Sequence, residues 1–426
     1  MKRRDFLKVV GVTAGSAAVP HMSAAAEERK TKPNILLIMA DDMGYECVGS
    51  YGGKDYKTPN LDNLAKTGVR FSHCYSQPLC TPSRVQIMTG RYNHRNYVGF
   101  GKLDEKEVTF GHLLKQAGYA TCIAGKWQLG QDRKLVAHFG FDEYCLWFLE
   151  NKSQRYVNVG ELIQNDRVMP GGKGEYGPDV VSGFMMDFIS RHRDGPFFCY
   201  YPMILPHGPF EPTPDSADAK CADDKQNFVD MVQYIDTIIG RLVEQLEQLG
   251  ILDNTLILFT TDNGTFKKIT SRTVDGDIQG AKGIMTDGGT HVPLIVNMKG
   301  TVPPGKVCDD LIDFSDFLPT LVEIADARLP SDRVIDGRSF LPQLQGKKGA
   351  PRDWIFCHYW EKGRRKEGVK EFVRNQRWKL YDEGSLYDIR NDPFEKSPLK
   401  KPNKEAIAAR GRLQEAFKSL KQGRQT

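Results

Sequence analysis

The chain has 426 residues, of which 40% are hydrophobic and 27% charged, and its formal net charge is +5. This length and hydrophobic content are sufficient to bury the core of one large domain and a smaller one. Part of the positive charge lies in the N-terminal segment, at Lys2, Arg3, Arg4 and Lys8. Because the chain has no basic run and no RNA-binding motif, its composition excludes a nucleic-acid-binding protein.

The N-terminus has the composition of a cleaved targeting signal. Arg3 and Arg4 precede Phe-Leu-Lys, an apolar stretch at 9–19 and small residues at 23–26. The paired arginines resemble a twin-arginine signal, which passes folded proteins to the twin-arginine export machinery. A plain secretory signal is the alternative. We expect a signal peptide at residues 1–26 and an exported protein, in the bacterial periplasm or secreted, with no transmembrane segment in the rest of the chain.

Short apolar runs then alternate with amphipathic stretches. Strands are predicted at residues 34–40, 119–124, 196–204, 255–261 and 294–298. Helices are predicted at residues 58–68, 106–118, 178–193, 223–250 and 313–326. The polar segment at 151–177 has no clear period and is predicted to be a loop insertion near the substrate.

The pattern changes at about residue 346. Residues 354–359 and 372–381 alternate like antiparallel strands, and a terminal helix is predicted at 403–421. The sequence therefore predicts an α/β fold with a large, mostly parallel mixed sheet flanked by helices, and a smaller C-terminal antiparallel sheet plus helix. We place these parts at residues 27–345 and 346–426.

Nine cysteines show no close pairing of the kind that binds metals. The odd number fits one cysteine that is consumed by modification. The other eight could form disulfides in an oxidising compartment, in a pairing that the sequence does not define. Cys122 and Cys199 lie within apolar runs, which favours buried free thiols for these two.

Polar side chains follow four of the predicted strands. They are Asp41 and Asp42, Lys126, His207, and Asp262 with Asn263. In open α/β sheets, ligands bind beyond the carboxyl ends of the strands, so these side chains can meet at one edge. Each alone has a simpler interpretation: a solvated turn for the two aspartates, a surface lysine, and a turn histidine.

A cysteine opens the helix predicted after residue 79. The sequence from Cys80 to Arg84 reads Cys-Thr-Pro-Ser-Arg and continues to Thr-Gly-Arg at 89–91. The free N–H groups and the dipole of a helix start favour negative charge near Cys80. Arg84 lies one turn further and can bind an anion with its planar guanidinium.

These motifs resemble the signature of type I (formylglycine-dependent) sulfatases, of the alkaline phosphatase superfamily. The resemblance begins with Pro-Asn-Ile-Leu-Leu-Ile-Met-Ala-Asp-Asp at 33–42 and covers nearly all of the mature chain. It implies that Cys80 is converted to 3-oxoalanine (formylglycine) by a formylglycine-generating maturation enzyme. In the family, the hydrate of this aldehyde is the nucleophile.

The resemblance also implies a metal site and a set of catalytic side chains. Oxygen donors without thiolate or imidazole ligands select a hard divalent cation. Calcium is implied, with magnesium as the runner-up, and the ligands are Asp41, Asp42, Asp262, Asn263 and an oxygen of modified Cys80. The implied catalytic residues are Cys80, Arg84, Lys126, His207 and Lys282. The cationic side chains of Arg84, Lys126 and Lys282 would stabilise the sulfuryl oxygens. His207 and Lys282 would also protonate the leaving group.

Gln128 departs from the family pattern. Related sequences usually carry a histidine at this position, which is thought to take a proton from the second hydroxyl of the hydrate. Glutamine cannot accept a proton near neutral pH, although it can form hydrogen bonds. Gln128, His94 and His291 are candidate substrate contacts, and structural roles are equally open for the two histidines.

The leading hypothesis is a sulfatase that removes sulfate from a sulfated carbohydrate or another sulfate ester. A phosphodiesterase or phosphonate monoester hydrolase of the same superfamily is the first alternative, because it can share the modified cysteine. A non-catalytic glycan-binding protein is the second alternative, and only Gln128 favours it.

Overall fold

The computed structural model describes residues 32–148, 154–360 and 368–422. The expected signal peptide at residues 1–26 lies outside these ranges. Among the helices in these three ranges, none combines the length and the apolar character that a bilayer crossing requires.

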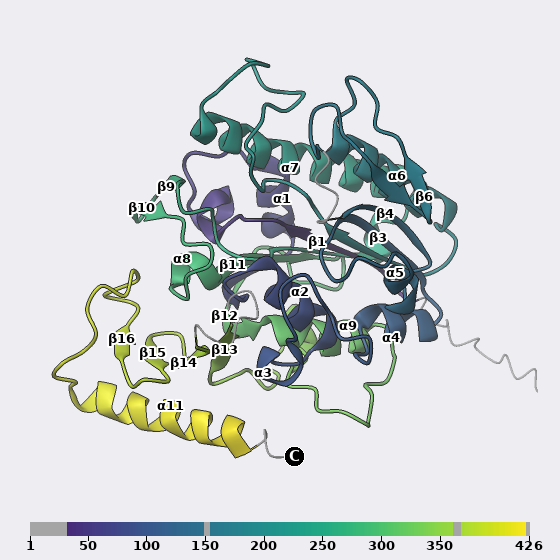
Figure 1. Cartoon of the computed structure of the whole chain (residues 1–426). Helices are drawn as coiled ribbons and strands as arrows, with labels where there is room; N and C mark the ends of the chain where they lie inside the picture. The colour runs from purple at the N-terminus through teal and green to yellow at the C-terminus, as the bar shows by residue number, and fades with distance from the viewer. Residues whose placement is uncertain (1–31, 149–153, 361–367, 423–426) are drawn as a thin grey trace, which may run out of the picture. The chain divides into compact units, whose positions relative to one another are not determined.

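A ten-stranded mixed sheet organises the described chain, in the order β12-β2-β11-β8-β1-β7-β3-β4-β5-β6 (Figure 1). Its strands are β1 (Asn34–Ala40), β2 (Val69–Tyr75), β3 (Ala120–Trp127), β4 (Glu143–Phe148), β5 (Leu162–Gln164), β6 (Arg167–Met169), β7 (Phe197–Pro202), β8 (Thr255–Thr261), β11 (His291–Asn297) and β12 (Lys306–Asp313). The central strands β8, β1, β7, β3 and β4 run parallel. β11 is antiparallel to both neighbours, and β5 and β6 extend the sheet in antiparallel fashion. The predicted large mixed sheet is confirmed.

Helices cover both faces of the sheet, because successive side chains of a strand point to opposite sides. The helices are α1 (Pro59–Thr67), α2 (Cys80–Thr89), α3 (Asn93–Asn96), α4 (Phe110–Gln116), α5 (Lys134–His138), α6 (Gly177–Arg191), α7 (Asp224–Gln248), α8 (Asp287–Thr290), α9 (Phe317–Ile324) and α10 (Leu341–Leu344). Figure 1 shows α1, α6 and α7 on one face and α2, α4 and α9 on the other.

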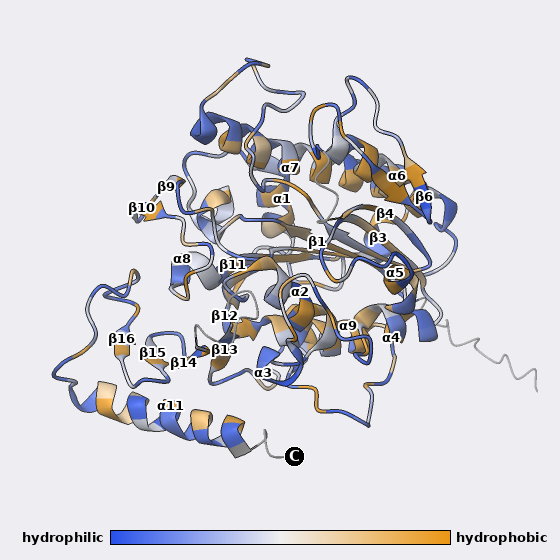
Figure 2. Cartoon of the chain, in the orientation of Figure 1, coloured by the Kyte–Doolittle hydropathy of each residue, from blue (hydrophilic) through white to orange (hydrophobic). Residues whose placement is uncertain are grey.

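The core is divided between these two faces. Leu37 and Met39 of β1 share one buried cluster with α2, α4 and α9, whereas Leu36 and Ile38 share the other with α1, α6 and α7. Hydrophobic residues of α6 and α7 lie on the side that faces the sheet (Figure 2). β1 is buried along its full length, which explains its nearly continuous apolar sequence.

A smaller antiparallel sheet follows, made of β13 (Ile355–Tyr359), β14 (Lys370–Arg374), β15 (Trp378–Tyr381) and β16 (Leu386–Asp388). Helix α11 (Lys404–Gln422) packs on it through Ala406, Ala409 and Leu413. The predicted C-terminal sheet and helix are therefore confirmed, whereas the boundary at residue 346 stays a prediction. A separate hairpin is formed by β9 (Thr270–Thr273) and β10 (Gly276–Gln279).

The main sheet has more strands than the five that the apolar runs indicated. Arg70 and His73 interrupt the apolar pattern of β2, and Asp309 and Asp310 interrupt that of the edge strand β12. β4 was also missed. The three-residue strands β5 and β6 lie in the segment predicted to be a loop, so part of that insertion extends the sheet. Strands this short carry too few residues for a period to be visible.

All nine cysteines lie in the described ranges and are free thiols, and eight of them are buried. The buried thiols predicted for Cys122 and Cys199 are confirmed. They lie opposite each other in the neighbouring strands β3 and β7.

Candidate active site

Helix α2 begins at Cys80 and is buried along its whole length. Leu79, directly before it, has an extended backbone, and the hydroxyl of Ser83 accepts a hydrogen bond from the Gln77 amide at 3.0 Å. These contacts hold the turn that carries Cys80, whose side chain is 2% exposed. Burial raises the pKa of the Cys80 thiol above its usual value, so the group is a protonated thiol at neutral pH.

The carboxylates at the ends of β1 and β8 meet because these two strands are parallel neighbours, with Ala40 opposite Thr261. The Asp262 amide donates to the Ala40 carbonyl at 3.0 Å. The Asp42 amide donates to Asp262 Oδ1 at 3.2 Å, and Asn263 Nδ2 donates to Asp42 Oδ1 at 2.9 Å. Asp41, Asp42, Asp262 and Asn263 are all fully buried.

Three cations from three separate elements lie against these carboxylates. Lys126 Nζ from β3 is 2.5 Å from Asp41 Oδ2. Arg84 Nη2 from α2 is 2.9 Å from Asp262 Oδ2 and 3.5 Å from Asp41 Oδ2. Lys282 Nζ, from the loop before α8, is 2.5 Å from Asp42 Oδ2. We call Asp41, Asp42, Cys80, Arg84, Lys126, His207, Asp262, Asn263 and Lys282 the Cys80 cluster.

The carboxylates of the Cys80 cluster differ in how easily they ionise. Burial alone would raise the pKa of Asp41, but Lys126, His207 and Arg84 hold it well below its usual range. Burial and the neighbouring Asp41 raise the pKa of Asp262 to about 7, against the opposing effect of Arg84. The negative charge of Asp262 is therefore poorly compensated by the side chains around it.

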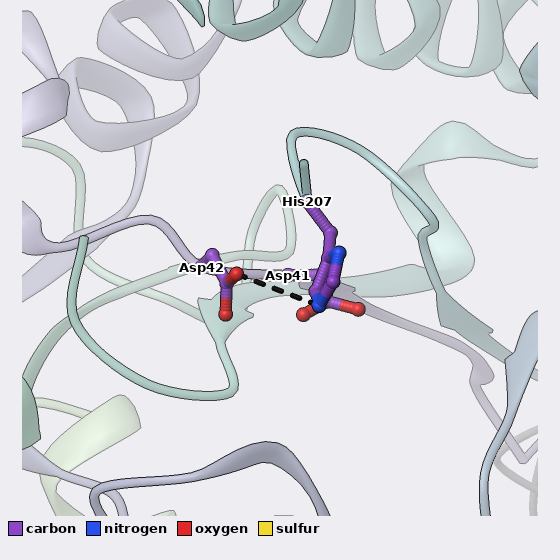
Figure 3. Close-up of side chains that lie close together, drawn as sticks. All are labelled: Asp41, Asp42 and His207. Carbon is purple, nitrogen blue, oxygen red and sulfur yellow. Dashed lines mark ion pairs between the residues drawn. The ribbon is translucent and has the colours of Figure 1, made fainter. Parts of the chain in front are cut away.

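His207 lies in the loop after β7 and projects toward Asp41 and Asp42 (Figure 3). Its Nε2 is 3.7 Å from Asp42 Oδ2. Its Nδ1, on the other edge of the ring, is 2.7 Å from the Gly208 carbonyl and 3.0 Å from Nη1 of Arg155. Burial lowers the pKa of His207, whereas Asp42 raises it.

The donor set fits a hard divalent cation. Oδ1 of Asp41 and Oδ1 of Asn263 are buried and accept no hydrogen bond from any described residue. Carboxylate oxygens of Asp41 and Asp42 and a ring nitrogen of His207 lie within 4.8 Å of one another. Buried acceptors are costly when they lack a partner, and a cation ligated by oxygen would satisfy them. The structure thus brings together the polar strand ends that the sequence indicated.

The three candidate substrate contacts lie in different surroundings. Gln128 follows β3 directly, is 1% exposed, and its Oε1 accepts no hydrogen bond from the described chain. His291 belongs to an aromatic stack, with ring centroids 4.1 Å from Tyr45 and 4.9 Å from Tyr75, and its Nε2 is 2.8 Å from the Ser72 carbonyl. His94 packs against Phe356 of the small sheet. These roles stay predictions.

Arg155 is a residue of this region that the sequence reading did not single out. It lies in the polar segment between β4 and β5, and no motif marks it. Its only signal was the expectation that this insertion lies near the substrate. The structure places its guanidinium beside His207 and over the ring of Trp147, which belongs to β4.

Comparison with known proteins gives consistent results. A family model described as "Sulfatase" matches residues 33–327, and one described as "N-sulphoglucosamine sulphohydrolase, C-terminal" matches residues 281–423. The chain is 30% identical to N-acetylgalactosamine-6-sulfatase of Canis lupus familiaris over 443 residues, which cover 86% of this chain and 81% of that one. It is 32% identical to arylsulfatase A of Bos taurus over 375 residues, which cover 79% of this chain and 72% of that one.

Solved structures agree in fold. The crystal structure of Ps i-CgsB superposes with a TM-score of 0.80 at 27% identity and covers 92% of this chain and 93% of that one. The complex of Ps i-CgsB with k-i-k-neocarrahexaose gives a TM-score of 0.79 at 27% identity, with the same coverage.

Proposed function

The chain belongs to the sulfatase family and hydrolyses sulfate esters, and we propose that its substrate is a sulfated carbohydrate. The observation that supports this most directly is Cys80, buried at a helix start and close enough to Asp41, Asp262, Lys126 and Lys282 for their charges to act on its thiol. The structural likeness to a protein crystallised with k-i-k-neocarrahexaose favours a saccharide substrate.

The nucleophile is formed from Cys80 by conversion to formylglycine, which requires a maturation enzyme. The unmodified group supports this proposal, because burial keeps the thiol protonated and therefore weakly nucleophilic. The hydrated aldehyde would supply an oxygen nucleophile and a second hydroxyl that can lose its proton.

Asp41, Asp42, Asp262, Asn263 and residue 80 would hold a divalent cation, for which calcium is the first candidate and magnesium the second. Their oxygens, two of which accept no hydrogen bond from the described chain, are the ligand type that both ions prefer. The ion would supply positive charge against the negative charge of the sulfate ester.

The remaining side chains bind the ester and move protons. Arg84, Lys126 and Lys282 point donors at the edge of the sheet where the sulfuryl oxygens would lie, and they stabilise the charge that builds up there. His207 is 23% exposed and therefore open to a bound ligand, so it can donate a proton to the leaving alkoxide together with Lys282. Gln128 orients a hydroxyl by hydrogen bonding.

The N-terminal segment and the two-part organisation complete the proposal. Residues 1–26 direct a folded protein to twin-arginine export into the periplasm. Residues 27–345 then form the catalytic domain, and 346–426 a subdomain whose Arg374 forms an ion pair with Asp287 of α8.

The proposal is tested by coexpression with a maturation enzyme. A peptide containing residue 80 is expected to weigh about 18 Da less than the encoded cysteine form. The matured protein should hydrolyse members of a panel of sulfated saccharides and an aryl sulfate faster than the matching aryl phosphate. Cys80→Ala should abolish all of these activities. An unchanged peptide mass despite an active maturation enzyme, or faster hydrolysis of the phosphate ester, would contradict the proposal.

A further inference from the structure

Arg155 is held against both the general-acid candidate and an aromatic platform. Its Nη1 lies 3.0 Å from Nδ1 of His207, which is also 2.7 Å from the Gly208 carbonyl. Its guanidinium carbon lies 4.3 Å from the centroid of the Trp147 ring, a distance at which a cation is attracted to an aromatic face. Trp147 is 2% exposed and lies in strand β4, so the platform is part of the rigid sheet.

The backbone around Arg155 is fixed relative to His207. The hydroxyl of Tyr156 donates to the carbonyls of Ile204, at 3.1 Å, and of His207. The Gly177 amide at the start of α6 donates to the Tyr156 carbonyl at 3.1 Å. A Cβ at residue 177 would lie 2.1 Å from the Arg155 carbonyl oxygen, so only glycine permits this close approach. The guanidinium is thus preorganised before any ligand arrives.

The charge of Arg155 differs from the other positive charges of the site. Arg84, Lys126 and Lys282 each lie within 3 Å of a carboxylate oxygen. Arg155 forms no ion pair within the described chain. Burial raises the pKa of the nearby Glu211, and the charge of Arg155 opposes this rise from a distance without a hydrogen bond between the two side chains. Arg155 is partly exposed, and Nη1 is the only guanidinium nitrogen with a hydrogen-bond partner among the described residues, so the other N–H groups are the candidates for binding a ligand.

This geometry points to a second anion site, and we propose that Arg155 binds a second acidic group of the substrate, a sulfate or a carboxylate. The inference rests on the proposed function. Arg155 contacts the ring edge of His207 opposite the edge that faces Asp42. Its anion is therefore separated from the scissile sulfate by the width of an imidazole, which places it at another position of the same sugar or on the next sugar. The preferred substrate is then a glycan with more than one negative charge.

Planar guanidinium groups bind such anions well, because two parallel N–H donors match two oxygens of a sulfate or a carboxylate. A lysine at the same position would keep the charge and lose this match. Since Arg155 also contacts His207, its replacement is expected to slow every substrate to some degree. The diagnostic quantity is therefore the ratio of kcat/KM between substrates with and without the second charge.

The experiment uses the matured, metal-loaded full chain and three disaccharides that share one scissile sulfate. The first has no other charge, the second has an additional sulfate, and the third has a uronic acid carboxylate. The unchanged protein should prefer one of the doubly charged substrates. Arg155→Gln should lower that preference about 10- to 100-fold, the loss of a hydrogen-bonded charge pair, and Arg155→Lys should retain part of it. The preferred anion identifies whether the second group is sulfate or carboxylate.

The control is Arg167→Gln, because Arg167 is an exposed arginine of β6 in the same insertion. It should leave the kcat/KM ratios unchanged. Equal ratios for Arg155→Gln and the unchanged protein, with both correctly folded by circular dichroism, would overturn the inference while the sulfatase proposal stands. If the protein with confirmed modification at residue 80 hydrolysed none of the three esters, the proposed function would fail, and this inference with it.

Discussion

Two groups of buried charges in this molecule follow opposite rules. The Cys80 cluster gathers carboxylates and cations whose hydrogen bonding is incomplete: Asp41 Oδ1, Asn263 Oδ1 and Arg84 Nε are buried and have no partner among the described residues. A second group lies where the C-terminal sheet contacts the rest of the chain, and its Lys379 also donates to the Met285 carbonyl. We call it the junction pairs: Arg352 with Asp316, Arg374 with Asp287, and Lys379 with Glu395.

The junction pairs are saturated. Arg352 Nε donates to both oxygens of Asp316, at 2.9 and 2.7 Å, while its Nη1 donates to the Tyr92 hydroxyl at 2.7 Å. Arg374 also donates hydrogen bonds to the carbonyls of Asn375 and Gln376, and its guanidinium carbon lies 4.3 Å from the centroid of the Tyr75 ring. The contrast shows how to separate structure from function among buried charges. The charges of the junction pairs have their partners within the described chain, whereas those of the Cys80 cluster keep acceptors and donors available for an ion and a substrate.

The sharpest test of this contrast is Asp262→Asn in the Cys80 cluster. Sulfatase activity should fall at least about 10⁴-fold, because a charged ligand of the proposed cation is lost. The free energy of unfolding of the chelator-treated protein at pH 8 should not fall by more than about 1 kcal/mol. Burial and Asp41 raise the pKa of the Asp262 carboxyl to about 7, so its ionised form does not stabilise the folded state at pH 8, and a neutral amide in its place costs little. Initial rates and urea unfolding measure both quantities, and a larger loss of stability would erase the distinction.

Arg352→Met tests the other side of the comparison. It leaves Asp316 buried without its cation, so the free energy of unfolding should fall by about 3–5 kcal/mol. Under conditions in which both proteins are folded, the kcat of the variant should stay within about threefold of that of the unchanged protein. Arg191→Met is the matched control, because its ion pair with Glu143 is exposed and should contribute no more than about 1 kcal/mol. Equal losses in the two variants would contradict the assignment of Arg352 as a structural ion pair.

His291 lies next to the junction pairs, and its burial makes stability depend on pH. Burial, together with His73 and Arg374, lowers its pKa from 6.5 to about 4, although Asp287 opposes the shift. The unfolded chain therefore binds more protons than the folded one between these values, and stability falls as pH drops through this window. The loss is about 3 kcal/mol. His291→Gln should flatten the dependence measured by urea unfolding, and an unchanged slope would assign the effect to other groups.

Gln128→His should produce the smallest effect. A histidine at this buried position could accept a proton from the second hydroxyl of the proposed hydrate, which glutamine cannot do. We expect the step that releases sulfate to become about tenfold faster, with little change in ester binding. Pre-steady-state kinetics separate the two steps. Identical release in both forms would show that another group already serves this role.

Most of the fold could be read from the sequence where a whole element carries one pattern. The apolar run of β1 and the amphipathic face of α7 identified their elements because burial acts on every residue of such segments. β2 and β12 were missed because charged residues interrupt them, and β5 and β6 because three residues hold no period. The sequence also predicted that the motif residues after the strands meet, because parallel strands place their carboxyl ends at the same edge of the sheet.

The sequence by itself determined which residue types surround Cys80, because short motifs hold these residues next to elements whose pattern is strong. Only the tertiary structure decided how they pair. Contacts between Arg155 and His207, or between Arg352 and Asp316, join residues 52 and 36 positions apart. Such partners are selected by the packing of separate elements, and local sequence carries no trace of that packing.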